Sequence, residues 1–356
     1  MWELLKSGSR VYHDRFHEDH GGSRRITEDR QNPRSLAGWY VFRRMTISSN
    51  HLPSPVGSPE RIKPNEIEQA IRVLVHGDRA AATRFLEYAK ASNLALDQTW
   101  VLRNPSGEIG MTALAAPAVG RTAMIFASRP TDRAAAIKAG VLIDATATGC
   151  RSMGVDLAQA LIDPVDSLEE SMFVAGGFHR LAQLDYLERP VPRFGTIQTP
   201  ALDANVEIRS WNQDDHAGLI DLLDRTYEDT LDCPGLAGLR RTQDILAGHL
   251  ASGTVQPQWW HILYVDGKAE GALLFNRGND GASIELVYLG LTAKIRGRGF
   301  GKTLLTFGLS LVDGDDARTV VLAVDRANLP AVRLYRRAGF RHSVRRTAVV
   351  RSLIEP

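Results

Sequence analysis

The pattern of apolar and polar positions divides the chain into a patternless start and two periodic stretches. Residues 1–60 are rich in Arg, His, Ser, Gly and Pro and have no periodic apolar positions, so they are predicted to be disordered. Periodic apolar positions fill residues 64–188 and resume over residues 204–356. Residues 190–203 contain three prolines and a glycine and predict a linker. The pattern therefore predicts two globular units after a tail.

The first unit combines helical and strand patterns. Apolar residues at helical spacing follow Asn65, which we expect to cap that helix, and continue past Phe85. The next apolar runs predict strands at 100–102, 110–115 and 122–128.

The second unit predicts a longer alternation of helices and strands. Helices are expected after Asn212 and Asp215, which would form a capping arrangement, around 239–250 and from Gly301 onward. The dipeptide Asp266-Gly267 between two apolar runs is a hairpin signal. The predicted strands are 259–265, 268–275, 283–291, 319–324 and 347–353. This order predicts an α/β fold with a mixed sheet and helices on both faces.

Composition limits the class of protein. With 356 residues, 44% of them hydrophobic, and a net charge of +2, the chain can bury two cores and lacks the charge excess typical of nucleic-acid binding. Two cysteines, Cys150 and Cys233, are too few for a disulfide framework or a zinc cluster. No apolar run approaches the roughly 18 residues of a membrane span, and the N-terminus lacks the apolar segment of a signal peptide. We therefore expect a cytoplasmic protein without membrane or nucleic-acid partners.

The tail contains one candidate for metal binding. His13, His17 and His20 have the spacing of ligands on a helix, but no shell of carboxylates and cysteines accompanies them. A solvated polar tail is the favoured interpretation, and no metal is predicted. Met45 is a candidate for an alternative start of translation.

Two short motifs carry most of the chemical information. Residues 296–301 read Arg-Gly-Arg-Gly-Phe-Gly and lead into an apolar helix, an arrangement that suits a pyrophosphate group. Residues 328–340 predict a helix with Asn328 at its start and Tyr335 on its inner face. The glycine spacing fits neither G-x-x-x-x-G-K-[ST] of nucleoside triphosphatases nor G-x-G-x-x-G of dinucleotide-binding folds. A glycine turn that only begins a helix is the alternative.

Together the motifs resemble the acyl-CoA-binding core of the GNAT N-acetyltransferase superfamily, in which R-x-x-G-x-G precedes N-x-x-A-x-x-L-Y-x-x-x-G-F. The resemblance implies acetyl-CoA as co-substrate and an amine as acceptor. It also implies that the strand end at Leu289, Gly290 and Leu291 pairs with the pantetheine arm. The cofactor-binding residues would be Leu289, Gly290, Leu291, Arg296, Gly297, Arg298, Gly299, Phe300, Gly301, Lys302, Asn328 and Tyr335.

Two residues are candidates for acid–base catalysis. Tyr335 would protonate the departing CoA thiolate, since a phenol and that thiolate are comparably basic. Glu285, eleven residues before Arg296, would deprotonate the amine. The alternatives are a core aromatic for Tyr335, an outward-facing strand carboxylate for Glu285, and a helix cap alone for Asn328. Cys233 is a less favoured candidate for a covalent nucleophile.

The first unit contains an altered copy of the second motif. Counted back from Gly177 and Gly339, Phe173 stands where Tyr335 stands and Asp166 where Asn328 stands. The stretch equivalent to the glycine turn contains Asp132 and Arg133 followed by three alanines, instead of paired glycines. The sequence therefore resembles tandem GNAT proteins, the group to which mycothiol synthase belongs.

These observations lead to one main hypothesis and one alternative. The main hypothesis is a tandem GNAT protein with a degenerate domain at 64–188 and a catalytic N-acetyltransferase domain at 204–356, in which acetyl transfer is direct. The alternative is a non-catalytic acyl-CoA-binding or protein-interaction module. Neither the acceptor nor the oligomeric state follows from the sequence.

Overall fold

The computed structural model describes residues 57–192 and 195–354, so nearly all of the predicted tail, with its three histidines, lies outside the described residues. The elements of the first half are β1 (Glu60–Arg61), α3 (Ile67–Leu74), α4 (Arg79–Ala91), β2 (Thr99–Arg103), β3 (Ile109–Ala118), β4 (Thr122–Ala127), α5 (Arg133–Gly149), β5 (Leu157–Ile162), α6 (Ser167–Ala175) and β6 (His179–Pro190). Those of the second half are β7 (Val206–Ser210), α7 (His216–Tyr227), α8 (Thr242–Ala251), β8 (Thr254–Val265), β9 (Lys268–Arg277), β10 (Ser283–Leu291), α9 (Phe300–Leu311), β11 (Thr319–Asp325), α10 (Leu329–Arg337) and β12 (Arg341–Ser352). The predicted mixed α/β fold is confirmed.

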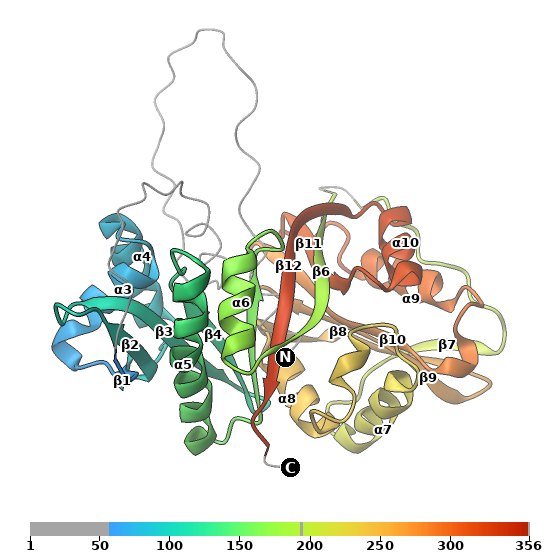
Figure 1. The fold of residues 1–356 in the computed structure, drawn as a ribbon. Helices are drawn as coiled ribbons and strands as arrows, with labels where there is room; N and C mark the ends of the chain where they lie inside the picture. The colour runs from blue at the N-terminus through green and yellow to red at the C-terminus, as the bar shows by residue number, and fades with distance from the viewer. Residues whose placement is uncertain (1–56, 193–194, 355–356) are drawn as a thin grey trace, which may run out of the picture.

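The described strands form one continuous twelve-stranded sheet in the order β1-β2-β3-β4-β5-β12-β6-β11-β10-β9-β8-β7 (Figure 1). The two halves exchange their last strands within it. Strand β6 pairs with β11, and β12 lies between β5 and β6. Each half therefore completes the sheet of the other.

Helices cover both faces of this sheet. In the second half, Leu274 packs with Leu222 of α7 on one face, while its neighbour Phe275 packs with Leu305 of α9 on the other. Strand residues that alternate in this way explain the apolar runs of the sequence. In the first half, α5 and α6 pack against each other and against β4 and β5.

The predicted helix starts are partly confirmed. Asp215 caps α7, since its carboxylate accepts a hydrogen bond from Gly218 N at 2.8 Å. The cap expected at Asn65 is wrong: Asn65 lies in a short 3-10 turn, and α3 follows Glu66 without a side-chain cap. Pro64 favours that turn because its φ is fixed. Among the described helices, none is long and apolar enough to cross a bilayer.

Candidate cofactor-binding and catalytic site

Strands β10 and β11 separate in the middle of the sheet. They pair in parallel only from Ser283–Thr319 to Glu285–Val321. Beyond this point β10 stays paired with β9 as far as Leu291, and β11 stays paired with β6 as far as Asp325. One edge of β10 is therefore left without a strand partner over residues 286–291, and we call the space between the diverging strands the wedge.

The strand end predicted to bind pantetheine lies along this edge. Leu289 and Leu291 pack against the core under α9 and α10. Position 290 requires glycine, because a Cβ there would collide with the hydroxyl of Tyr288. The wedge thus presents free backbone groups, as an added extended chain would need.

The glycine turn leads from β10 into α9. Gly297 and Gly299 have φ values of 75° and 93°, which favour glycine, and space around both is open. Lys302 N and Thr303 N donate the first hydrogen bonds of this helix, both to Gly299 O. The amides before Lys302 lie at the positive end of the helix and have no side-chain cap, so the turn suits an anion. The side chains of Arg298 and Lys302 are exposed beside it.

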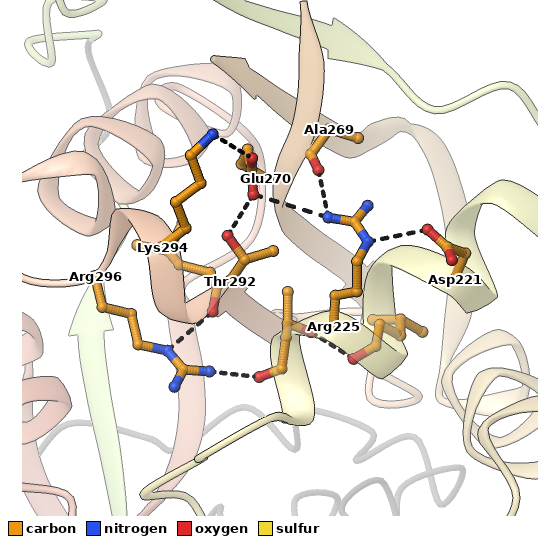
Figure 2. Close-up of polar contacts among 10 residues, drawn as sticks. Asp221, Arg225, Ala269, Glu270, Thr292, Lys294 and Arg296 are labelled. Atoms are coloured by element: carbon orange, nitrogen blue, oxygen red, sulfur yellow. Dashed lines mark hydrogen bonds and ion pairs between the residues drawn. The ribbon is translucent and has the colours of Figure 1, made fainter. Parts of the chain in front are cut away.

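Arg296 has a different environment from the one expected. Its guanidinium donates to three carbonyl oxygens: those of Leu291 at 3.0 Å, Asp229 at 3.0 Å and Thr226 at 2.8 Å. These bonds fasten the end of α7 to the end of β10 (Figure 2). Arg296 therefore fixes the position of the glycine turn relative to α7. Contact between its side chain and a phosphate stays a prediction.

A buried carboxylate braces the same region from β9. Glu270 is 5% exposed. It accepts a hydrogen bond from the Thr292 hydroxyl at 2.5 Å and forms ion pairs with Lys294 at 3.4 Å and Arg225 at 3.8 Å (Figure 2). Arg225 in turn donates to the carbonyl of Ala269 at 2.9 Å. Because these contacts join α7, β9 and the turn, they hold the turn in one position.

Helix α10 brings Asn328 and Tyr335 to the other side of the wedge. Asn328 caps the helix by accepting from Ala331 N at 3.2 Å. Tyr335 is 7% exposed, packs edge-on against Phe340, and forms no hydrogen bond through its hydroxyl with any described residue. Burial, and then the charge of Asp232 and the nearby Tyr288, raise the pKa of Tyr335 above its ordinary value. The phenol therefore keeps its proton at neutral pH.

Glu285 lies where β10 and β11 begin to separate. The alternative of an outward-facing carboxylate is wrong, because Glu285 is 4% exposed. Its Oε2 accepts a hydrogen bond from the Ser252 hydroxyl at 2.9 Å, which places it on the face covered by α7 and α8. Tyr335 belongs to the face covered by α9 and α10. The two acid–base candidates thus approach the wedge from opposite faces.

Sequence reasoning missed Tyr288. A β-bulge separates Leu286 from Tyr288, and the Tyr288 hydroxyl lies 2.7 Å from that of Thr226. The Thr226 hydroxyl donates to the carbonyl of Leu223, so Tyr288 is the donor to Thr226. Burial raises the pKa of Tyr288 and outweighs these hydrogen bonds. Only the bulge brings this ring to the wedge, and a bulge has no clear signal in the sequence.

Cys233 is unsuited to covalent catalysis. Its side chain is 2% exposed. Burial and the charges of Asp232 and Asp325 raise the pKa of its thiol well above the ordinary value. A reactive cysteine needs the opposite, an accessible thiolate near positive charge.

The first half has an equivalent parallel strand pair, helix start and aromatic pair, but it lacks the candidate functional residues of the second half. Strands β4 and β5 also pair in parallel over three positions, and Met124 stands at the register position of Glu285. The N-terminus of α5 is occupied by the carboxylate of Asp132, which accepts from Ala135 N at 2.8 Å. Phe173 packs edge-on against Phe178 as Tyr335 does against Phe340. No glycine turn, buried acid or phenol is present at these positions.

Comparison with known structures identifies the class of fold. The chain is similar to a GCN5-related N-acetyltransferase from Sphaerobacter thermophilus, with a TM-score of 0.53, 16% identity, and coverage of 83% of this chain and 96% of that one. A tandem GNAT protein from the clavulanic acid biosynthesis pathway aligns over 84% of this chain and 98% of its own, with 16% identity and a TM-score of 0.45. The match to the Sphaerobacter thermophilus structure shows that the fold is that of GCN5-related N-acetyltransferases.

A family model matches part of the second half. Residues 223–340 match the model of the Acetyltransferase (GNAT) family, so the chain carries a GNAT domain. A segment of 56 residues is 41% identical to a mycothiol acetyltransferase of Corynebacterium glutamicum and covers 16% of this chain and 19% of that one. The chain thus matches less than a fifth of the length of that relative.

Proposed function

We propose that this protein is an acetyl-CoA-dependent N-acetyltransferase with its active site at the wedge of the second half, within residues 204–356. The observation that carries the proposal is the early end of the β10–β11 pairing beside an uncapped glycine turn. An unpaired strand edge offers hydrogen bonds to an extended amide arm, and the helix start offers amides to a pyrophosphate. Acetyl-CoA contains both groups.

In the proposed reaction the acceptor and acetyl-CoA are bound together. Glu285 takes a proton from the acceptor ammonium, because a protonated amine has no lone pair. The amine nitrogen then forms a bond to the thioester carbonyl carbon, and backbone N–H groups near Leu289 stabilise the oxyanion. When the carbon–sulfur bond breaks, the Tyr335 hydroxyl donates its proton to the sulfur. The nitrogen gives up its second proton in the same step, which restores the Tyr335 hydroxyl, while the first proton stays on Glu285. The products are an acetylated amine and CoA.

The remaining residues would bind without taking part in the chemistry. Gly297, Gly299, Phe300 and Gly301 supply the backbone of the anion site, and Arg298 and Lys302 supply positive charge. Asn328 has a structural role as a cap, and its amide group is proposed to contact pantetheine as well. We propose that residues 64–188 are a degenerate GNAT-like domain, and that the protein acts in the cytoplasm without a metal ion.

Release of CoA thiol measures the proposed activity directly. The full chain is incubated with acetyl-CoA and a panel of amines, and the thiol is detected colorimetrically while calorimetry measures CoA binding. We expect amine-dependent thiol release. Binding of CoA without release for any amine would favour the alternative, a non-catalytic acyl-CoA-binding module. Absence of CoA binding would refute both.

A further inference from the structure

A chain of buried hydrogen bonds leads from β8 through β9 and the end of α8 to Glu285, the proposed base. At its centre is Asn276, which is fully buried and lies directly opposite Glu285 in the antiparallel pairing of β9 and β10. Asn276 Oδ1 accepts a hydrogen bond from Nε1 of Trp260 at 2.8 Å, and Trp260 is also fully buried. The carboxamide of Asn276 is therefore held in one orientation.

The other end of this carboxamide holds the end of α8. Asn276 Nδ2 donates to the carbonyl of His249 at 2.9 Å and to that of Ser252, the residue directly after the helix, at 2.7 Å. The next residue, Gly253, has a φ of 63°, and a Cβ there would collide with the carbonyl oxygen of Arg277, the neighbour of Asn276. The backbone of Ser252 is thus fixed closely against β9.

The fixed backbone directs the hydroxyl of Ser252 to the carboxylate of Glu285. Ser252 is 6% exposed, and its Oγ donates to Glu285 Oε2 at 2.9 Å. The bonds from Asn276 go to backbone carbonyls, which any residue at position 252 would supply. The serine hydroxyl is therefore not needed to hold the end of α8, and its hydrogen bond goes to Glu285.

The depth of Glu285 makes this hydrogen bond important for its charge. Glu285 is 4% exposed, and burial favours the neutral form of a carboxyl group. A hydrogen bond from the Ser252 hydroxyl favours the ionised form instead, which a base must have before it can accept a proton. The paired residues, Asn276 of β9 and Val321 of β11, do not titrate. The other titratable groups on this face of the sheet are His249 of α8, Tyr227 of α7, Tyr288 of β10, and Asp325 of β11 with Asp232 beside it.

We propose that Ser252 is a positioning residue for the acetyl transfer: its hydroxyl holds the carboxylate of Glu285 at the wedge and favours the ionised form. Asn276 and Trp260 act one step further away, because they fix the end of α8 from which the hydroxyl is presented. The inference rests on the proposed function, since it assumes that Glu285 is the base. Ser252 itself exchanges no proton with the acceptor.

Titration of the Glu285 carboxyl group tests the proposal without any acceptor. The full chain is prepared with isotopically labelled glutamate for NMR, and the signal of Glu285 is identified by its absence from Glu285→Gln. We expect the midpoint of its titration to lie about one to two pH units higher in Ser252→Ala than in the wild type, the scale of one hydrogen bond to a charged group. Ser252→Thr keeps a hydroxyl and should restore the wild-type midpoint. The alanine variant keeps the carbonyl to which Asn276 donates, so the fold should survive.

Ser283→Ala is the matched control. Ser283 is also 6% exposed, lies on the same strand as Glu285, and donates from its hydroxyl to another carboxylate, that of Asp280, at 2.7 Å. This variant should leave the Glu285 midpoint unchanged. Ser252→Cys has a weak donor of similar size, should raise the midpoint by less than alanine does, and takes the place of the alanine variant if that one does not fold. An unchanged midpoint in the folded Ser252 variant, or an equal rise in Ser283→Ala, would overturn the proposal.

The pH dependence of acetyl transfer is a second measurement and separates this inference from the proposed function. For an amine that the wild type acetylates, the acid limb of the kcat/KM profile should move to higher pH in Ser252→Ala, by the same amount as the titration. A lower rate at every pH with the acid limb in its wild-type place would show that Ser252 is only structural and would overturn the proposal. Absence of transfer to every amine, together with a raised midpoint in Ser252→Ala, would overturn the proposed enzyme activity alone.

Discussion

Substitution of Gly299 by alanine tests whether the turn before α9 binds the pyrophosphate. Gly299 has a φ of 93°, and nothing lies within 4 Å of the position that a Cβ would occupy. The protein itself therefore leaves room for the methyl group. The cost to folding comes from the backbone conformation alone, about 1–2 kcal/mol for a residue with a Cβ in the left-handed region.

The effect on CoA should be larger than the effect on folding. If alanine relaxes to a negative φ, the amide groups of Phe300 and Gly301 turn away from their common direction. One lost charge-assisted hydrogen bond is worth about 1.5–3 kcal/mol, and each 1.4 kcal/mol is tenfold in affinity. We therefore expect CoA to bind about tenfold to a hundredfold more weakly to Gly299→Ala.

Gly267 provides the control for backbone strain. It has a φ of 74° in the hairpin between β8 and β9, and nothing lies within 4 Å of its Cβ position. Gly267→Ala should lose similar stability in thermal melts while its CoA affinity, measured by calorimetry, stays at the wild-type value. An unchanged affinity in folded Gly299→Ala, or an equal loss in Gly267→Ala, would show that the turn does not bind the anion.

Other predictions follow from the two faces of the wedge and from the first half. Tyr335→Phe should lower kcat by about 10² to 10⁴ with little change in CoA affinity, the usual scale for a positioned acid, and wild-type turnover would reduce Tyr335 to a core residue. Because the pKa of Tyr335 is raised, loss of its proton should not limit the rate below the ordinary phenol pKa of 10.0. Glu285→Gln should lose the most rate at pH values below the pKa of the acceptor amine, which a pH–rate profile would detect. Calorimetry should give one CoA per chain, because Asp132 occupies the helix start in the first half; two equivalent sites would contradict this. Neither Cys150 nor Cys233 should react with a thiol reagent at pH 8 before denaturation, since burial raises the pKa of both thiols.

The local features of the site could be predicted because they depend on neighbouring residues. The repeated motif is the clearest case: Phe178 N bonds to Phe173 O at 3.0 Å, and Phe340 N bonds to Tyr335 O at 3.0 Å. Gly177 and Gly339 have φ values of 81° and 88°. A helix that ends at a glycine in this conformation is encoded by adjacent residues, so counting back from each glycine found equivalent positions.

Contacts between distant segments could not be predicted in the same way. The role of Arg296 depends on the backbone carbonyls of Thr226 and Asp229. Every residue has such a carbonyl, so the residue types do not show which ones Arg296 binds. Tyr288 lies in an apolar strand, and its contact with Thr226 depends on a β-bulge. The sequence therefore gave no reason to single it out.

Strand exchange gives a physical reason for keeping a first half that lacks the features of an anion site. All seven residues of β11 pair with β6, whereas only three pair with β10. Without β6, the strand that forms one side of the wedge would keep only its short pairing with β10. Strand β12 would likewise lose β5 and β6, its partners on both sides. The wedge can open because β11 is held from its other edge, so the first half stabilises the site through the sheet and needs no cofactor of its own to do so.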